Sequence, residues 1–403
     1  MKIAIDVTPL VGSQLGGTAR YARHLLKGLT ETDKENEYLI YLDRDWQHDN
    51  IKVRDNFSIW IPGGHKSWRN SFLSTNCAWM DLFYRYGLME QMILPRYLKN
   101  DRVNLFHSTV NALPLTKVCK FIATIHYVTP TVHPEHAGAS LYLNTINFLH
   151  RVFTPLMVNK ADRVIAVCES IKKDVMQVYN YPEERIRVIT PSVDEIFRVI
   201  SKQEAEKVKN KYGIPEDYIL YLDHASWHYE MHRFFEAFCT LKKVMAVPHK
   251  LVLAGNFPPA HLEYIRAFIE ARELSDEVIQ TGFVPDEDLV QLYNAATLLV
   301  YPLTYEGFGI VPLEAMACGT PVIAITSTAP MVREMVGDAG IIIDSHNLNA
   351  LIQAMYTVLT DRKFRSKMVE KGLRRAEQSN WRMIARKTLD VYKELLEELP
   401  SQL

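Results

Sequence analysis

Two patterns of hydrophobic and polar residues alternate along the chain: short apolar runs, and longer stretches with apolar residues at helical spacing. Short apolar runs are typical of buried strands, and their alternation with helices is typical of βα units around a parallel sheet. The strands expected in the first half are Lys2–Val7, Tyr38–Leu42, Leu105–His107, Phe121–Ile125, Arg163–Val167 and Ile186–Ile189. Those expected in the second half are Tyr218–Leu222, Lys250–Ala254, Val278–Thr281, Leu298–Tyr301, Val322–Ala324 and Ile341–Ile343.

The stretches between these strands predict amphipathic helices. The first, Ala19–Thr30, carries Tyr21, Leu25, Leu26 and Leu29 at helical spacing. Further helices are expected at Ser201–Lys211, Asp286–Ala295, Pro312–Ala317 and Trp381–Leu399. Two successive sets of βα units predict an α/β protein with two doubly wound domains, whose ligands bind at the carboxyl ends of the strands.

Composition narrows the class of protein. With 48% hydrophobic and 23% charged residues, the chain of 403 residues is globular rather than disordered. Its formal net charge of −1 argues against a nucleic-acid partner, which requires a basic face. Five cysteines without CxxC spacing predict reduced thiols. No apolar run approaches the roughly 18 residues of a membrane span, so a soluble cytoplasmic protein is expected.

The stretch VYPLTYEGFGIVPLEAMACGTPVIAI, residues 300–325, is the most informative of the chain. A buried strand runs into a Gly-Phe-Gly turn at Gly307–Gly309, and a short helix follows. Small residues and free N–H groups at a helix N-terminus favour an anionic ligand. Glu306 and Glu314, 314 − 306 = 8 positions apart, flank this turn and suit the hydroxyls of a sugar and a ribose. The alternative is that Glu306 is an ordinary loop carboxylate and that Glu314 is a capping or surface residue of the helix.

This stretch resembles the signature of retaining nucleotide-sugar glycosyltransferases of the GT-B fold, the family-four type also called glycosyl transferases group 1, which includes bacterial polysaccharide and lipopolysaccharide mannosyltransferases. Ala161–Arg198 resembles the end of the family's first domain, and Gln280–Pro302 is close to a complete family pattern. The resemblance implies two Rossmann-like, doubly wound domains facing a central cleft. Residues 1–198 would form the acceptor side and residues 199–380 would bind the donor. The helix at 381–403 would cross back to the first domain.

The resemblance also implies roles for residues of the first half. Gly16 and Gly17 match the glycine loop that reaches over the donor phosphate, and Arg20 would contact a phosphate or the acceptor. His126, at the carboxyl end of an apolar strand, would stand near the reacting anomeric carbon. The family's neighbouring Asp is Tyr127 here, so no carboxylate beside the histidine fixes its tautomer. A purely structural histidine is the alternative, and His107 is a further candidate on the cleft edge.

In the second half, the resemblance implies a donor site on the glycine turn and the strand before it. Glu306 would bind the sugar hydroxyls and Glu314 the ribose. The implied donor-binding residues are Phe283, Val284, Glu306, Gly307, Phe308, Gly309, Ile310 and Glu314. No metal site or cofactor is expected, because helix dipoles and basic side chains neutralise the leaving diphosphate in this fold.

The largest departure from the family follows the strand Tyr218–Leu222. Where the family has an Arg and a Lys that clamp the diphosphate, this chain has His228 and Tyr229. Neither supplies a permanent positive charge. Three explanations remain open: another basic residue, Arg233 or Arg333, takes over; the donor phosphate differs; or catalytic activity is weak or absent.

The function expected from these features is transfer of a hexose, mannose or a related sugar, from a GDP- or UDP-linked donor to a cell-surface glycan or lipid-linked acceptor. The alternative is a non-catalytic GT-B subunit that supports a partner transferase. Asn70–Leu98 is rich in aromatic residues and Met, with Arg interspersed. Core packing explains such residues by default. A lipid-facing surface is the alternative, which would place the protein peripherally on the inner face of the membrane.

Overall fold

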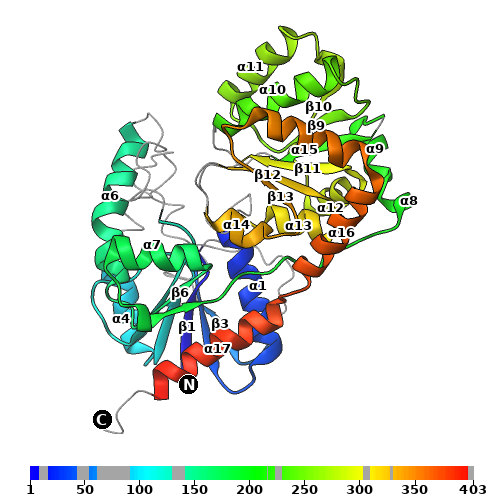
Figure 1. Cartoon of the computed structure of the whole chain (residues 1–403). Coiled ribbons are helices and arrows are strands. Elements are labelled where there is room, and N and C mark those ends of the chain that lie inside the picture. Colours follow the sequence, from blue (N-terminus) through cyan, green and yellow to red (C-terminus); the bar gives the residue numbers. More distant parts are fainter. Residues whose placement is uncertain are drawn as a thin grey trace. The chain divides into compact units, whose positions relative to one another are not determined.

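The structure of the protein is a computed structural model that describes residues 1–8, 17–42, 54–60, 91–128, 141–215, 217–222, 229–302, 309–326 and 330–397. The chain divides into two compact units, Met1–Pro191 with Asn380–Leu403, and Ser192–Ser379. Each unit contains a parallel sheet with helices packed on it (Figure 1).

The first unit contains a seven-stranded parallel sheet of order β3-β2-β1-β4-β5-β6-β7. Its strands are β1 (Lys2–Asp6), β2 (Glu37–Tyr41), β3 (Phe57–Trp60), β4 (Leu105–Ser108), β5 (Lys120–Ile125), β6 (Arg163–Ala166) and β7 (Ile186–Val188). Its helices are α1 (Gly17–Thr32), α4 (Leu94–Asn100), α6 (Leu141–Val158), α7 (Glu169–Tyr179), the 3-10 turn η4 (Glu183–Arg185) and α17 (Trp381–Glu397). The strand order reverses between β1 and β4, which is where open α/β sheets place their ligands.

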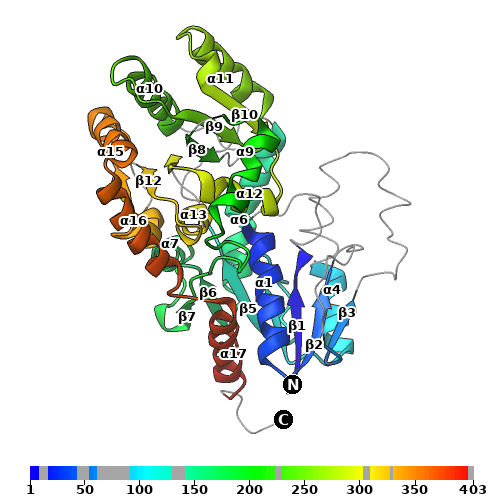
Figure 2. The same cartoon turned by 90° about the vertical axis from the view of Figure 1, so that its right-hand side faces the viewer.

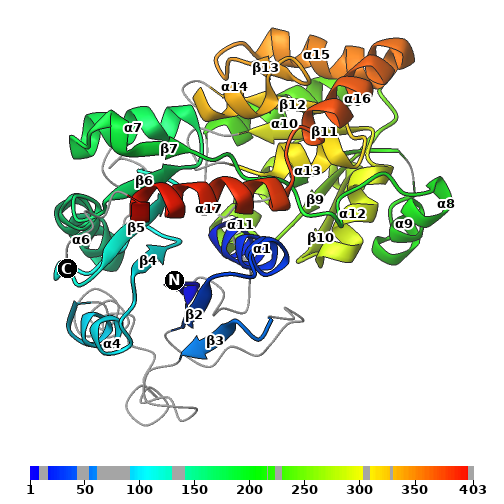
Figure 3. The same cartoon turned by 90° about the horizontal axis from the view of Figure 1, so that it is seen from below.

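The last helix of the chain, α17, packs against the first helix, α1, on one face of this sheet (Figures 2 and 3). Its buried residues recur at helical spacing: Trp381, Ile384, Ala385, Thr388, Leu389, Val391, Tyr392, Leu395 and Leu396. Gly28 on α1 allows the close approach. A Cβ added there would lie 2.8 Å from the Trp381 carbonyl oxygen and 2.9 Å from the Ala385 Cβ.

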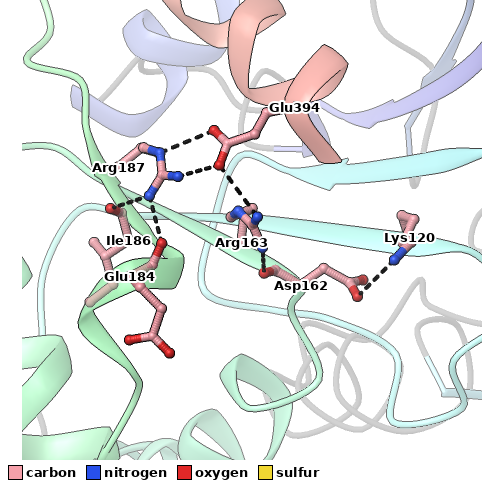
Figure 4. Close-up of polar contacts among 7 residues, drawn as sticks. All are labelled: Lys120, Asp162, Arg163, Glu184, Ile186, Arg187 and Glu394. Carbon is pink, nitrogen blue, oxygen red and sulfur yellow. Dashed lines mark hydrogen bonds and ion pairs between the residues drawn. The ribbon is translucent and has the colours of Figure 1, made fainter. Parts of the chain in front are cut away.

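A carboxylate near the end of α17 also ties this helix to the sheet. Glu394 accepts hydrogen bonds from the guanidinium groups of Arg187 on β7 and Arg163 on β6, the latter at 3.3 Å (Figure 4). The two guanidinium groups hold the pKa of Glu394 below its usual value, against the opposing effect of burial. The C-terminal helix is therefore an integral part of the first unit.

The second unit contains a six-stranded parallel sheet of order β10-β9-β8-β11-β12-β13. Its strands are β8 (Tyr218–Leu222), β9 (Lys250–Ala254), β10 (Val278–Gly282), β11 (Leu298–Pro302), β12 (Val322–Ile325) and β13 (Ile341–Ile343). Its helices are α8 (Lys202–Ala205), α9 (Lys207–Tyr212), α10 (Tyr229–Lys243), α11 (Pro259–Glu270), the 3-10 turn η5 (Ser275–Glu277), α12 (Asp286–Ala295), α13 (Val311–Ala317), α14 (Pro330–Val336), α15 (Leu348–Thr360) and α16 (Arg362–Ala376). Here the order reverses between β8 and β11.

The hydrophobic pattern located the expected strands to within one residue at each end. It missed β3, a four-residue strand at the edge of the first sheet. Only one inward residue of β3, Phe57, is clearly buried, where it stacks on Tyr38 at 4.4 Å between ring centroids. Such a strand lacks the continuous apolar run of a strand buried on both faces. The single helix expected at Ser201–Lys211 is two short helices, α8 and α9, which meet at Glu206.

Candidate functional site

The carboxyl edge of the first sheet carries a cluster of buried polar side chains at the point where the strand order reverses. Asp6 ends β1 and is 4% exposed, and Ser108 ends β4. The Thr109 hydroxyl donates to the Asp6 carbonyl oxygen at 2.7 Å, and the Thr8 amide donates to the Asp6 carboxylate at 2.9 Å. The sequence showed Asp6 only as an aspartate inside an apolar run, which is the one signal that could have identified it.

His126 follows β5 and joins this cluster. Its Nε2 lies 2.9 Å from the Thr109 carbonyl oxygen. Because a carbonyl oxygen only accepts, Nε2 carries the proton and Nδ1 is left as an acceptor. Burial lowers the pKa of His126 to about 4, although the bond to Thr109 opposes the shift. The ring is therefore neutral at pH 7 and presents an acceptor of the kind that a sugar hydroxyl can donate to.

The sequence predicted that no neighbouring carboxylate fixes the tautomer of His126, and the structure shows a different group in that role. The residue that fixes it is a backbone carbonyl seventeen positions away in sequence, not a neighbouring carboxylate. Tyr127, which replaces the family's Asp, is 39% exposed.

His107, a further candidate on the edge, is wholly buried on β4. Its Nδ1 lies 2.6 Å from the Tyr392 hydroxyl, and its Nε2 lies 2.8 Å from the Thr124 hydroxyl. Burial, and after it the proximity of His126, lower the pKa of His107 to about 3. The ring lies beneath the edge rather than on it, and its hydrogen-bonding atoms are occupied by the protein.

The glycine loop of the first unit is described only in part. Gly17 is exposed and begins α1, and Arg20 is half-buried on the same helix. Gly16 lies outside the described residues. The described start of α1 therefore carries Gly17 and Arg20, two of the three residues predicted to lie on the phosphate side. Arg20 directly precedes Tyr21, whose ring contacts His126.

In the second unit, the glycine turn leads into α13. Gly309 has a φ of 40°, a left-handed conformation that favours glycine, and Ile310 is the N-cap. Glu314 lies in the first turn of α13 and is only 2% exposed. The Tyr293 hydroxyl donates to Glu314 Oε2 at 3.1 Å. Glu314 is thus a buried, hydrogen-bonded carboxylate near the positive end of a helix, not a surface residue.

The segment after β10 combines one exposed and one buried side chain. Gly282 ends the strand with a φ of 69°. Phe283 follows with 59% of its side chain exposed, whereas Val284 is 9% exposed. An exposed phenylalanine between a glycine and a buried valine offers a planar apolar face.

The candidate phosphate clamps differ in their surroundings. Arg233 on α10 donates to Glu236 at 3.0 Å, an ion pair within one turn of the helix. Arg333 is exposed in the last turn of α14. His228, Glu306, Gly307 and Phe308 lie outside the described residues.

The described part of the chain lacks two further features. No group of His, Cys, Asp or Glu side chains there is placed to hold a metal ion. Among the same residues, every helix is too short or too polar to cross a bilayer.

Comparisons with known proteins identify the family of the chain. The family description "Glycosyl transferases group 1" matches residues 202–375, and "Glycosyltransferase Family 4" matches residues 15–196. The chain is 29% identical over 282 residues to the serotype-specific mannosyltransferase WbdA of Escherichia coli, an alignment that covers 69% of this chain and 34% of WbdA. It is 26% identical over 297 residues to the O-antigen chain mannosyltransferase B of Escherichia coli, covering 73% and 76% of the two chains.

Solved structures match over nearly the whole chain. WaaG, a glycosyltransferase involved in lipopolysaccharide biosynthesis, superposes with a TM-score of 0.70 at 18% identity, covering 97% of this chain and 99% of WaaG. HepE of Anabaena, in complex with UDP and glucose, superposes with a TM-score of 0.68 at 17% identity, covering 98% and 100%.

Two parallel α/β units with these strand orders define a protein of the GT-B fold. The chain belongs to glycosyltransferase family 4, the glycosyl transferases group 1, and is a distant relative of bacterial O-antigen mannosyltransferases. It spans about a third of the length of the WbdA mannosyltransferases that it matches.

Proposed function

We propose that the protein is a retaining glycosyltransferase that moves a hexose, mannose or a related sugar, from a GDP- or UDP-linked donor to a glycan or lipid-linked acceptor of a cell-surface polysaccharide. Membership of the family supports the reaction class. The two mannosyltransferase relatives support the sugar, and the complex of HepE with UDP and glucose supports a nucleotide-sugar donor.

The observation that carries the proposal is the buried carboxylate of Glu314. An ionised group out of water is costly unless hydrogen bonds and charges compensate it. Here the Tyr293 hydroxyl and the N-terminus of α13 supply compensation, directly after the turn at Gly309. A carboxylate held in this way accepts hydrogen bonds only, so it suits the paired hydroxyls of a ribose.

The remaining roles follow from the same assignment. Glu306 binds the hydroxyls of the donor sugar, and the backbone N–H groups of Phe308, Gly309 and Ile310 hold the phosphate side. Phe283 and Val284 face the nucleotide base, while Gly16, Gly17 and Arg20 face the donor phosphate. His126 acts beside the anomeric carbon and accepts a hydroxyl bond through Nδ1. The leaving phosphate takes the proton of the acceptor hydroxyl, so the protein contributes orientation and charge stabilisation.

The diphosphate clamp is the open part of this assignment. Arg233 would have to exchange its pairing with Glu236 for a phosphate, whereas Arg333 is exposed. If His228 serves instead, affinity for a nucleoside diphosphate should weaken as the pH rises past about 6.5, because the ring loses its charge. A flat affinity from pH 5.5 to 8.5 would leave Arg233→Ala and Arg333→Ala as the next variants to titrate.

The experiment that tests the proposed function is a thermal-shift screen of sugar nucleotides, followed by calorimetric titration with GDP and UDP and a transfer assay with the best donor. A ligand that binds only the folded state raises the melting temperature by mass action. Binding together with transfer supports the enzyme. Nucleotide binding without transfer to any glycan or lipid-linked acceptor would favour the alternative, a non-catalytic subunit that supports a partner transferase. Absence of binding would reject both the donor site and the enzyme.

We also propose that the protein is cytoplasmic and makes peripheral contact with anionic lipid on the inner face of the membrane. Most of Asn70–Leu98, which first suggested this contact, lies outside the described residues. Among the described residues the support comes from α6. Phe148, Val152 and Leu156, four positions apart, are 63%, 42% and 51% exposed and form an apolar stripe. The sequence of α6 contains no acidic residue, and Arg151 is exposed beside the stripe.

Sedimentation with vesicles tests this contact. We expect the protein to sediment with phosphatidylglycerol vesicles and not with phosphatidylcholine vesicles, because a basic, apolar helix face favours anionic headgroups. The double variant Phe148→Ser with Leu156→Ser should lose the sedimentation. Val244→Ser, which removes a 76% exposed valine of the second unit, is the matched control. Equal sedimentation of all three proteins would show that α6 does not contact lipid.

A further inference from the structure

The side chain of Tyr21 lies at the centre of a group of rings in the first unit. Its ring meets the His126 ring edge-on, with centroids 4.7 Å apart, and meets the Trp381 ring edge-on at 5.7 Å. Trp381 in turn stacks on His24 of α1 at 5.1 Å. The first residue of α17 thus holds one side of Tyr21, while His126 lies against another.

The hydroxyl group of Tyr21 is held by a second route that also begins on α17. The Tyr392 hydroxyl bonds to His107 Nδ1 at 2.6 Å, and His107 Nε2 bonds to the Thr124 hydroxyl at 2.8 Å. The Thr124 hydroxyl lies 3.4 Å from the Tyr21 hydroxyl. The path runs from α17 through β4 and β5 to α1, and its two histidine contacts are short.

The directions of these three hydrogen bonds are linked. His107 is neutral, so one ring nitrogen donates and the other accepts. If Tyr392 donates to Nδ1, then Nε2 donates to Thr124, and Thr124 is free to donate to Tyr21. If instead Nδ1 donates to Tyr392, then Thr124 donates to Nε2, and Tyr21 donates to Thr124. A change at Tyr392 therefore alters the bonding of Tyr21 even though the two residues lie on different helices.

All members of this path are buried, and none of them has a role of its own in the proposed reaction. Tyr392, His107 and Thr124 show no exposure, and Tyr21 is 2% exposed. A buried polar path of this kind is costly if any member is left unpaired. Its free end lies at the Tyr21 ring, which contacts His126 at the carboxyl edge of the sheet.

We propose that Tyr21 is a positioning residue for His126, and that the C-terminal helix sets its place through the ring of Trp381 and through the path Tyr392–His107–Thr124. The proposal rests on the proposed function only where it concerns catalysis. On this view α17 has a second role besides packing on the first unit. It fixes the angle at which the His126 ring presents Nδ1, together with the bond from Nε2 to the Thr109 carbonyl oxygen.

The test compares single hydroxyl deletions at buried tyrosines of the first unit. Tyr392→Phe removes the start of the path, and Tyr181→Phe is the matched control. Tyr181 is 4% exposed and donates to the Ala161 carbonyl oxygen at 3.0 Å, away from the path. We expect Tyr392→Phe to lower kcat about fivefold, the equivalent of one neutral hydrogen bond, with nucleotide Kd unchanged within about twofold. Tyr181→Phe should change neither.

A conservative pair separates positioning from packing at the middle of the path. Thr124→Ser keeps the hydroxyl and should retain kcat within about twofold. Thr124→Val keeps the shape and should lose about fivefold. If Thr124→Ser and Thr124→Val lower kcat equally while their melting temperatures differ from wild type by the same amount, the path supports the fold and not His126.

A spectroscopic measurement keeps this inference separate from the proposed function. The Cε1–Hε1 resonance of His126, assigned through His126→Gln, reports the ring's contact with Tyr21 in the ligand-free protein. It should shift in Tyr392→Phe and stay in place in Tyr181→Phe. A resonance that does not move in Tyr392→Phe would overturn the proposal, whether or not the protein transfers sugar. A shift without transfer in the wild type would uphold the path and reject the enzyme.

Discussion

The carboxyl edges of the two sheets are built in different ways. In the second unit, the turn at Gly309 and the carboxylate of Glu314 come from one continuous stretch, in which Gly309 and Ile310 lead directly into α13. In the first unit, Asp6, Thr109 and His126 come from three segments that only the fold brings together. A site built from one stretch leaves a motif in the sequence, whereas a site assembled from distant segments leaves isolated polar residues in apolar strands.

The two edges also differ in the side chains that they carry. The second carries a buried carboxyl group, that of Glu314, which accepts a hydrogen bond from the Tyr293 hydroxyl. The first carries the imidazole of His126, which burial holds neutral, together with Asp6 at the end of β1. Under the proposed function, the oxygens of this carboxyl group of Glu314 accept hydrogen bonds from the hydroxyls of the nucleotide. Under the proposed function, the neutral ring of His126 lies near the anomeric carbon, which gains positive charge in the transition state. A cationic imidazolium would be repelled there.

The largest expected effect uses the neutral histidines. Their pKa values, about 4 for His126 and about 3 for His107, lie below the ordinary value of 6.5, so the unfolded chain binds protons that the folded chain does not. Their contribution to stability is present above pH 6.5 and is lost as the pH falls toward 4 for His126 and toward 3 for His107. At pH 5 each should cost about 2 kcal/mol of unfolding free energy, or about 4 kcal/mol together.

Urea unfolding at pH 7.5 and pH 5.0 measures this loss. His107→Gln should remove about half of the acid sensitivity seen in the wild type, because one of the two buried rings is gone. His346→Gln, at an exposed position of the second unit, is the control and should leave the sensitivity as it was. An acid sensitivity identical in His107→Gln and wild type would mean that the pKa of this ring does not differ between the folded and the unfolded chain.

The second prediction concerns Glu314 at the edge of the second sheet. Glu314→Gln keeps the shape of the side chain and removes its charge, so it should lower donor affinity and kcat/KM together. The loss of a charged hydrogen bond to substrate is worth about 1.5–3 kcal/mol, which corresponds to about tenfold to a hundredfold. Glu169→Gln, at an exposed glutamate in the first turn of α7, is the matched control. Calorimetric titration with the donor and initial rates check both, and wild-type affinity in Glu314→Gln would exclude this carboxylate from the site.

How much of each edge could be predicted from the sequence depends on whether its contacts are local or join distant segments. The turn at Gly309 and the position of Glu314 relative to it are local, so the pattern of residues predicted both. The burial of Glu314 was not predicted, because it depends on Tyr293, which lies on a different helix. For His126 the sequence supplied the strand end but not the group that orients the ring. That group is the carbonyl oxygen of Thr109. Every residue has a backbone carbonyl, so the sequence cannot indicate which one bonds to the ring.

The same reasoning explains what the sequence showed of the C-terminal helix. Its length and amphipathic stripe follow from local spacing. The contact between Tyr392 and His107 joins residues 285 positions apart, and no pattern within either segment predicts it. Gly28 gives a weaker signal, because a glycine inside a helix can indicate close packing without naming the partner.

The smallest expected effect separates the two edges most cleanly. His126→Ala should lower kcat about tenfold or more, the loss of one oriented hydrogen bond at the reacting sugar, while nucleotide Kd stays within about twofold. Glu314→Gln should instead weaken nucleotide binding, so the two variants should show opposite kinetic signatures.

Because the pKa of His126 is about 4, its ring should not titrate in the wild-type kcat profile between pH 6 and 8. Tyr127→Phe, next to it in sequence, should retain kcat, because Thr109 orients the ring. A loss of nucleotide binding in His126→Ala, with a lowered melting temperature, would assign His126 to the core of the first unit instead.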